Sequence, residues 1–236
     1  MPEYFVVLVE PVFEESVGFV ARSMKNFGLH ELCLVNPLAT LSANGRMRAG
    51  HAQDVLDSMT VQGSLSQALD GADITVGTTA WASLSSSNLL RCSVTPRELA
   101  HVVGSAEGKV ALVFGREGTG LNDGELGRCD VVMTIPSARD YLTLNLFHAA
   151  AIVFYELFQV KNTEPSQILA NEATKQKILE LLSKSAYSVG VKEYKVGIAV
   201  RTLRNIIGRS GIRRREASVL AGVLRKISDG LTKHED

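Results

Sequence analysis

The sequence predicts an α/β protein, with a mostly parallel sheet flanked by helices and a small all-α C-terminal extension. Up to about residue 160, short β-branched runs alternate with longer amphipathic runs, the pattern of helices packed on a parallel sheet. Beyond residue 170 the spacing of apolar residues is helical. Because 45% of the 236 residues are apolar and the mean hydropathy is +0.10, the chain can bury a core. We expect a sheet domain over residues 1–160, a linker over 161–170 and a helical domain over 171–236.

The expected sheet domain alternates strands with helices. Pro96 after Thr95, and Asn122 before an acidic turn, are favourable helix starts. The last helix is apolar nearly all round, so it must be buried in the core or against a partner subunit, and we expect a homodimer. The predicted strands are Tyr4–Val9, Leu32–Asn36, Asp73–Thr78, Val110–Phe114 and Val131–Ile135. The predicted helices are Glu14–Phe27, Ala52–Ser58, Ser64–Leu69, Pro96–Val103, Asn122–Arg128 and Leu144–Gln159.

The C-terminal region differs from the sheet domain in charge. Residues 1–160 hold 10 Lys and Arg against 17 Asp and Glu, whereas residues 161–236 hold 15 against 8. A basic extension on an acidic body favours an RNA or DNA partner at the extension, and it is equally compatible with a solvated helical face that pairs with the body. Pro165 marks the linker. The helices expected after it are Glu172–Ser188, Lys195–Ile207 and Arg213–Ile227.

Several classes of protein are excluded by what the sequence lacks. The longest apolar run, 142–158, is interrupted by polar residues and is too short for a membrane helix, and the first residues lack the basic start of a signal peptide. No dinucleotide fingerprint, Walker sequence or nucleophile elbow is present, and the histidines and cysteines lack metal-ligand spacing. We expect a cytoplasmic protein without a metal site, in which Cys33, Cys92 and Cys129 are reduced thiols.

Glycine and polar residues follow several of the predicted strands. Gly115–Leu121 has three glycines after an apolar strand, Thr78 and Thr79 end another strand, and Ile135–Asn145 joins the fifth strand to the apolar helix. Glycines let a ligand approach the main chain closely, although a tight strand-to-helix connection has the same composition. Polar residues at the start of a buried helix also suit capping. Together these segments place polar groups at the carboxyl ends of strands, where open α/β sheets bind ligands.

Three segments of the chain also occur in a recognisable order. They are Ser16–Leu29, then Leu112–Leu121, then Ile135-Pro136 with Leu142–Leu146. This set resembles the three motifs of the SpoU branch of the SPOUT RNA methyltransferases, and the TrmJ type of tRNA ribose 2′-O-methyltransferase in particular. The similarity extends over essentially the whole chain, including Asn36-Pro37 and the basic helical extension. The resemblance implies a deep trefoil knot, an S-adenosylmethionine pocket built by the knot loops, and an obligate homodimer with a site at the interface.

The resemblance also implies roles for individual residues. Catalytic roles fall on Arg22, Glu117, Thr143 and Asn145, where Arg22 corresponds to the arginine assigned to the ribose hydroxyl. From its residues alone, Arg22 is also compatible with a surface ion pair. One departure is Ser16, because the family commonly has Asn at this position and serine lacks the amide. The residues implied in cofactor binding are Thr78, Thr79, Ala80, Gly115, Gly120, Ile135, Pro136, Leu142, Thr143 and Leu144.

The expected substrate is tRNA, methylated on the ribose of nucleotide 32 in the anticodon loop. Alternatives are a 2′-O-methyltransferase of another RNA such as rRNA, a catalytically silent RNA-binding SPOUT homologue, and a nucleotide-binding regulator with an ordinary α/β sheet. An intact second and third motif favours the enzyme. The basic extension is expected to bind tRNA phosphates. The residues assigned to this contact are Arg201, Arg204, Arg209, Arg213, Arg214 and Arg215.

Overall fold

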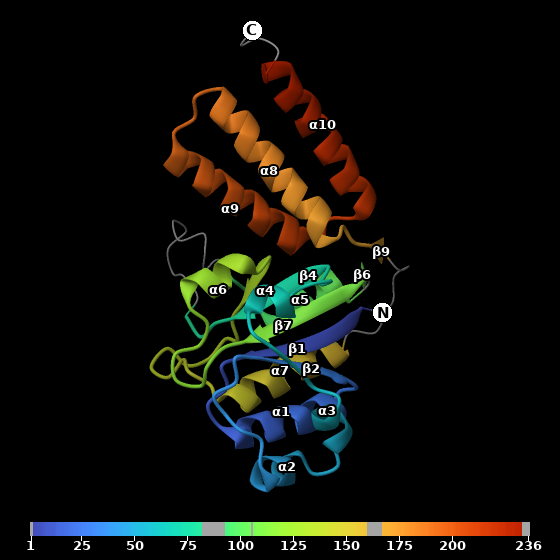
Figure 1. The fold of residues 1–236 in the computed structure, drawn as a ribbon, viewed down its shortest axis with the longest axis vertical. Coiled ribbons are helices and arrows are strands. Elements are labelled where there is room, and N and C mark those ends of the chain that lie inside the picture. Colours follow the sequence, from blue (N-terminus) through green and yellow to red (C-terminus); the bar gives the residue numbers. More distant parts are fainter. Residues whose placement is uncertain (1, 82–92, 105, 160–166, 233–236) are drawn as a thin grey trace.

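A seven-stranded parallel sheet forms the centre of the protein. The computed structural model describes residues 2–81, 93–104, 106–159 and 167–232 (Figure 1). The strand order is β3-β2-β1-β7-β4-β8-β5, and every neighbouring pair is parallel, which confirms the predicted α/β class. The trefoil knot stays a prediction. The strands are β1 (Glu3–Val9), β2 (Glu31–Val35), β3 (Thr60–Gln62), β4 (Ile74–Thr78), β5 (Ser93–Val94), β7 (Lys109–Phe114) and β8 (Val131–Met133).

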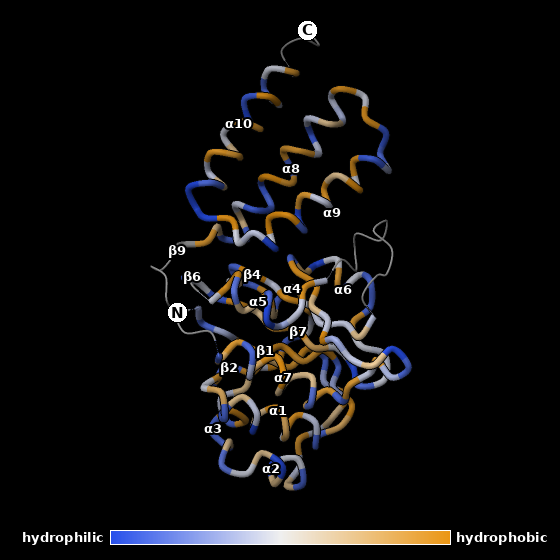
Figure 2. Tube along the Cα trace, turned by 180° about the vertical axis from the view of Figure 1, so that it is seen from behind, coloured by the Kyte–Doolittle hydropathy of each residue, from blue (hydrophilic) through white to orange (hydrophobic). Residues whose placement is uncertain are grey.

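The five strands predicted from the sequence are the five central ones. Each is buried on both faces and reads as an almost unbroken apolar run, as expected for a sheet covered by helices on both sides. Figure 2 shows these apolar residues gathered along the central strands. The sequence did not predict β3 and β5 at the two edges. They are short, and β3 is largely exposed, so neither has an apolar run.

Helices cover both faces of the sheet. Alternate residues of a strand point to opposite faces, so Val6 and Leu8 pack under one helical layer and Val7 under the other. The first layer consists of α1 (Glu14–Asn26), α3 (Gln53–Asp57), α5 (Pro96–Val103) and α7 (Leu146–Gln159). The second layer consists of α4 (Leu65–Ala68) and α6 (Asp123–Arg128).

Helix α2 (Ala43–Ala49), which the sequence did not predict, packs closely on α1. A Cβ atom at Gly18 would lie 2.1 Å from the carbonyl oxygen of Gly45, so the two backbones touch where both residues are glycine. The Glu14 carboxylate accepts hydrogen bonds from the Ser42 backbone N–H at 2.6 Å and from its hydroxyl at 2.9 Å. Contacts to α1, and not local helix propensity, therefore hold α2 in place.

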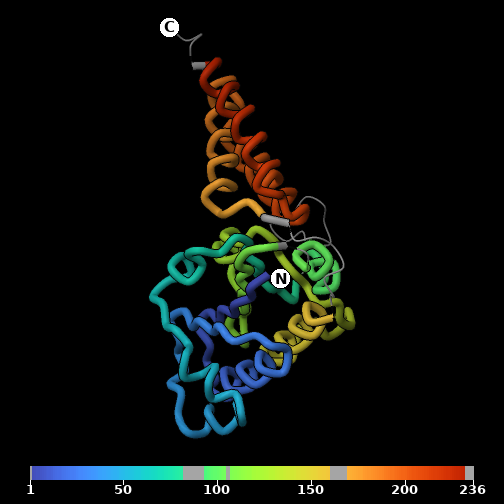
Figure 3. The backbone as a smooth tube through the Cα atoms, turned by 90° about the vertical axis from the view of Figure 1, so that its right-hand side faces the viewer, coloured from blue at the N-terminus to red at the C-terminus, as the bar shows by residue number. Residues whose placement is uncertain are grey.

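The C-terminal extension is a layer of three helices above the sheet (Figures 1 and 3). It consists of α8 (Glu172–Ser188), α9 (Glu193–Ser210) and α10 (Arg214–Thr232), with α8 between the other two. Two short strands, β6 (Ala106–Glu107) and β9 (Gln167–Ile168), pair in parallel beside it. The end of the predicted linker is therefore part of a strand pair, and residues 160–166 lie outside the described part of the chain.

A buried charge cluster joins the extension to the amino-terminal edge of the sheet. The Lys175 ammonium lies 2.7 Å from Asp130 Oδ2, and the two side chains are 4% and 1% exposed. The same carboxylate oxygen accepts hydrogen bonds from the Thr75 backbone N–H and hydroxyl at 3.0 and 2.9 Å. Arg204 binds the other oxygen at 3.1 Å. Because Asp130 immediately precedes β8, this cluster fixes the helices to the edge opposite the carboxyl ends of the strands.

The described residues contain no helix long and apolar enough to cross a membrane. Cys33 and Cys129 are free and buried, in agreement with the sequence, whereas Cys92 lies outside the described residues. Burial, with Asp130 beside it, raises the pKa of the Cys129 thiol to about 12. Neither thiol is therefore expected to react in the folded protein.

Replacing Lys175 with Met should destabilise the protein by about 3 to 5 kcal/mol, because the buried Asp130 carboxylate would lose the more deeply buried of its two cations and keep only Arg204. The matched control is Lys177→Met on the same helix, where an exposed pair with Glu180 at 3.5 Å is lost and the cost should stay below about 1 kcal/mol. Denaturant unfolding measures both. Equal effects of the two substitutions would contradict a structural role for the cluster.

Candidate functional site

A pocket lies at the carboxyl edge of the sheet, where β4, β7 and β8 end. It has a cavity volume of about 160 Å³ and opens to solvent. Three connections build it: the residues after β4, the glycine loop 115–121 after β7, and the segment from β8 to α7. The lining residues are Thr78–Trp81, Phe114–Leu121, Met133, Ile135, Leu142–Leu144, Leu146 and Ala149.

The structure brings together nearly all of the residues predicted to bind the cofactor. Thr78, Thr79, Ala80, Gly115, Gly120, Ile135, Leu142, Thr143 and Leu144 all line this pocket, and Pro136 does not. The sequence did not predict Trp81, Phe114, Met133 or Leu146, which supply much of the apolar lining. Phe114, Met133 and Leu146 sit in apolar runs that were assigned to the core, and no pattern separates a core residue from one that also borders a cavity. Trp81 lies outside those runs and is 61% exposed.

The glycine loop folds back on itself. The Gly120 backbone N–H donates to the Arg116 carbonyl at 2.9 Å, and the two residues form a bridge. A Cβ atom at Gly115 would lie 2.2 Å from the Gly120 carbonyl carbon, and Gly120 has a φ of +67°, which disfavours other residues. Both glycines are required by the shape of the loop, whereas Gly118 borders open space.

The Arg116 guanidinium holds this loop to its surroundings. It binds Glu10 at 2.8 Å, the Gly120 carbonyl at 3.2 Å and both oxygens of Glu125 at 3.1 and 2.9 Å. The hydrogen bonds to Glu125 and Glu10 raise the pKa of Arg116. The hydrogen bond between Arg116 and Glu10 in turn lowers the pKa of the Glu10 carboxyl. Glu10 has a φ of +47°, so the turn after β1 is a sparsely populated conformation that this contact supports.

Glu117, the next residue, connects the loop to α1. Its carboxylate accepts hydrogen bonds from the backbone N–H groups of Val12 and Phe13, at 3.0 and 3.3 Å. Phe13 is the N-cap of α1, so this contact places a negative charge at the start of the helix that carries Arg22. In the described residues, Glu117 thus has a structural partner, and its side chain links the pocket to the candidate catalytic helix.

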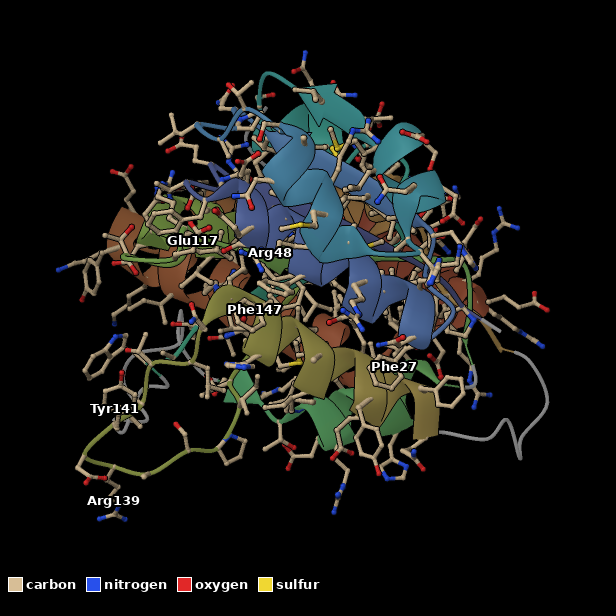
Figure 4. All side chains as sticks on the ribbon, turned by 90° about the horizontal axis from the view of Figure 1, so that it is seen from below. Phe27, Arg48, Glu117, Arg139, Tyr141 and Phe147 are labelled. Atoms are coloured by element: carbon tan, nitrogen blue, oxygen red, sulfur yellow. The ribbon has the colours of Figure 1, made fainter. Side chains whose placement is uncertain are left out.

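Arg22 is exposed on α1 and has no hydrogen-bonding partner among the described residues, so the alternative of a surface ion pair has no support there. The Phe19 and Phe147 rings, 4.9 Å apart, hold the start of α7 on α1. Thr143 and Asn145 are exposed just before α7. Figure 4 shows this surface from below, with the loop of Arg139 and Tyr141 extending away from the body. Arg48 of α2 stacks over Phe19 at 5.8 Å, a second cation here that the sequence did not predict.

The predicted RNA-binding arginines divide into two groups. Arg201 donates to the carbonyls of Gly127 and Cys129 at 3.3 Å, and Arg204 belongs to the Asp130 cluster. Burial, and then the neighbouring Arg204 charge, lowers the pKa of Arg201. These two arginines hold the extension to the body, in line with the alternative that basic helices pair with the acidic domain. The exposed group consists of Arg209, Arg213, Arg214 and Arg215.

Both the sequence and the fold are similar to those of known RNA methyltransferases. The model of the SpoU rRNA methylase family matches residues 3–155. The tRNA (cytidine-2′-O-)-methyltransferase TrmJ of Methanocaldococcus jannaschii is 30% identical over 228 residues, covering 93% of this chain and 97% of that protein. The tRNA (cytidine/uridine/adenosine-2′-O-)-methyltransferase TrmJ of Pseudomonas aeruginosa is 33% identical over 252 residues, covering 96% and 95%. The crystal structure of TrmJ from Z. mobilis ZM4 superimposes with a TM-score of 0.70 at 26% identity, covering 96% and 99%.

The fold is that of an RNA methyltransferase of the SPOUT class. Within that class, the chain belongs to the SpoU rRNA methylase family, as the matched motifs indicated.

Gly115→Ala should destabilise the protein by about 1 to 3 kcal/mol, because the added methyl group overlaps the Gly120 backbone. Gly118→Ala in the same loop meets nothing within 4 Å and should change stability by less than about 0.5 kcal/mol. Denaturant unfolding of the two variants tests this. If Gly115→Ala were as stable as Gly118→Ala, the folded-back loop would be wrong.

Proposed function

We propose that the protein transfers a methyl group from S-adenosylmethionine to a ribose 2′-hydroxyl of tRNA, at nucleotide 32 of the anticodon loop. The observation that carries the proposal is a pocket in which residues of the second and third motifs meet, at the start of the helix that packs on the helix of Arg22. The TrmJ proteins named above act on tRNA, as their names state, and they match over nearly the full length of this chain.

The residues of the pocket fit S-adenosylmethionine. Apolar side chains such as Met133, Ile135 and Leu142 suit the faces of an adenine ring, and the glycine loop exposes main-chain groups that can read its edge. Among the described lining residues, the charged ones are Arg116 and Glu117, and both are bound to other groups. A pocket without a free charge favours loss of the positive charge that methyl transfer removes.

S-adenosylmethionine supplies the sulfonium methyl group. In the transfer, the bond between the ribose oxygen and the methyl carbon forms as the carbon–sulfur bond breaks, and the hydroxyl proton leaves. Because a guanidinium group stays protonated in proteins and cannot act as a base, we assign Arg22 the role of a donor that holds a phosphate and stabilises the developing alkoxide. The proton then leaves through phosphate or water. Thr143 and Asn145 supply further donors near the start of α7.

The same proposal includes a homodimer formed by the outer face of α7. The inner face of this helix is in the core, but Ile152, Tyr155 and Phe158 are 38%, 49% and 62% exposed. Phe27, which directly follows α1, lies beside α7 (Figure 4). Its ring is 6.1 Å from that of Tyr155 and 5.9 Å from that of Phe158, so it extends the apolar surface. A patch of aromatic side chains on one helical layer suits a second copy of the chain.

Transfer of tritium from labelled S-adenosylmethionine to unmodified tRNA tests the activity, and an rRNA transcript tests the substrate. Arg22→Ala should lower kcat by about 100- to 1,000-fold, because a transition-state donor is lost. S-adenosylhomocysteine should bind this variant with nearly unchanged affinity. Lys25→Ala, one turn further along α1, is the control and should remain active. Loss of S-adenosylhomocysteine binding in Arg22→Ala would contradict the assigned role.

Ile152→Glu should convert a dimer into a 25.5 kDa monomer, because each copy would bury a charge at the interface. Light scattering at low protein concentration measures the mass. Val61→Glu, on the exposed edge strand β3, introduces the same charge at a site outside the proposed interface and should stay dimeric. A monomeric wild-type protein, or a dimeric Ile152→Glu variant, would rule out this interface.

A further inference from the structure

A polar groove runs between α8 and α10 on the C-terminal extension, and the sequence did not predict it. Small residues, among them Ala173, Ala221 and Gly222, leave space between the two helices. Hydroxyl and amide groups come from Thr174, Ser218 and Asn171, and cations from Lys177 and Arg225. No acidic residue is among the described residues that line it. The groove is distinct from the pocket at the carboxyl edge of the sheet.

We infer that this groove binds the phosphodiester backbone of the RNA substrate, and this inference rests on the proposed function. Backbone contacts in nucleic-acid complexes come from lysine and arginine together with hydroxyl and amide groups, which is the set found here. A positive groove follows a phosphate backbone without reading its bases. An acidic peptide would be attracted by the same cations, but it would also seek apolar pockets for its side chains, and the lining residues offer none.

Helical spacing places a further arginine in line with the groove on α10. On α10, Arg214, Ser218, Gly222 and Arg225 follow one another at helical intervals and lie on one face. Ser218 donates to the Arg214 carbonyl at 2.9 Å, so its hydroxyl oxygen still has a free lone pair and its position is fixed. The sequence assigned Arg214 to RNA binding by charge alone, and its position places it on the same face of α10 as the residues of the groove.

The charges on α8 are arranged for the same contact. Lys177 is exposed, and its ammonium pairs with Glu180 at 3.5 Å, with both side chains 55% exposed. An exposed pair at this distance is weak, so a phosphate can replace the carboxylate at little cost. Lys175, two residues earlier, belongs to the buried Asp130 cluster and does not reach the groove. Lys175 therefore has a structural role, and Lys177 on the same helix is the lysine available to the RNA.

Gly222 allows a test that leaves the fold intact. A Cβ atom at this position meets nothing within 4 Å, and the residue lies within α10, where any side chain except proline is tolerated. Gly222→Glu therefore puts a carboxylate into the groove without a clash. Gly230→Glu makes the same change on the same helix, also with nothing within 4 Å, at a position that does not line the groove.

The experiment measures tRNA binding by the full-length protein as a function of salt. Gly222→Glu should raise the dissociation constant at least tenfold, whereas Gly222→Ala and Gly230→Glu should stay within about twofold of wild type. Lys177→Ala with Arg225→Ala should reduce the slope of log K against log salt by about 1 to 2 units. Affinity for S-adenosylhomocysteine should be unchanged in every variant.

The outcomes separate the two proposals. A wild-type protein that neither binds tRNA nor methylates it overturns the proposed function, and this inference with it. A wild-type protein that does both, while Gly222→Glu binds tRNA as tightly as Gly230→Glu and the salt slope of the double variant is unchanged, overturns the groove alone. Circular dichroism and the unfolding midpoint confirm that the variants compared are equally folded.

Discussion

The contacts of Arg116 connect the parts of the site to one another. Its guanidinium reaches the turn after β1, the far end of the glycine loop and the first turn of α6, and no shorter or more flexible cation reaches all three in a fixed geometry. Glu117 beside it reaches the start of α1. Two adjacent residues thus fix both the wall of the pocket and the helix that carries Arg22. The positions of the expected cofactor and of the expected catalytic donor therefore depend on the same loop.

Charge on this protein has two separate uses, and sequence alone does not distinguish them. Lys175, Arg201 and Arg204 all belong to the basic C-terminal region, yet they point at Asp130 and at carbonyls of the body. Arg214 and Arg225 belong to the same region and face solvent. The number of charges predicts that something acidic is bound. Only the structure shows which basic side chains pair with acidic groups of the same chain and which face solvent and can bind an acidic partner.

The predictions from sequence succeed where a segment is determined by its own pattern. β1 is apolar on both faces, and α5 has its capping residues and proline in place, so the ends of both are predicted within a residue. The sequence did not predict α2, because this helix is held by contacts with residues far away in sequence. These are the hydrogen bond of Ser42 to the Glu14 carboxylate and the contact of Gly45 with Gly18. The glycine loop was predicted correctly because its own residues determine its conformation, which requires glycine at positions 115 and 120. The groove between α8 and α10 has no local signature, because small residues mark it only when two helices face each other.

The candidate pocket and the attachment of the C-terminal extension lie at opposite ends of the sheet. The pocket lies at the carboxyl ends of β4, β7 and β8, whereas the extension is attached before β8, at Asp130. A strand such as β7, with six residues, spans about 20 Å. A nucleotide in a stacked strand spans about 3.4 Å, so an RNA that touches both ends of one subunit extends over several nucleotides. Under the proposed function, discrimination between RNAs then rests on the shape of a folded substrate as well as on the base beside the methylated ribose. The nearly neutral pocket and the basic extension suit the proposed function, in which affinity for phosphates is supplied away from the site where a positive charge is consumed.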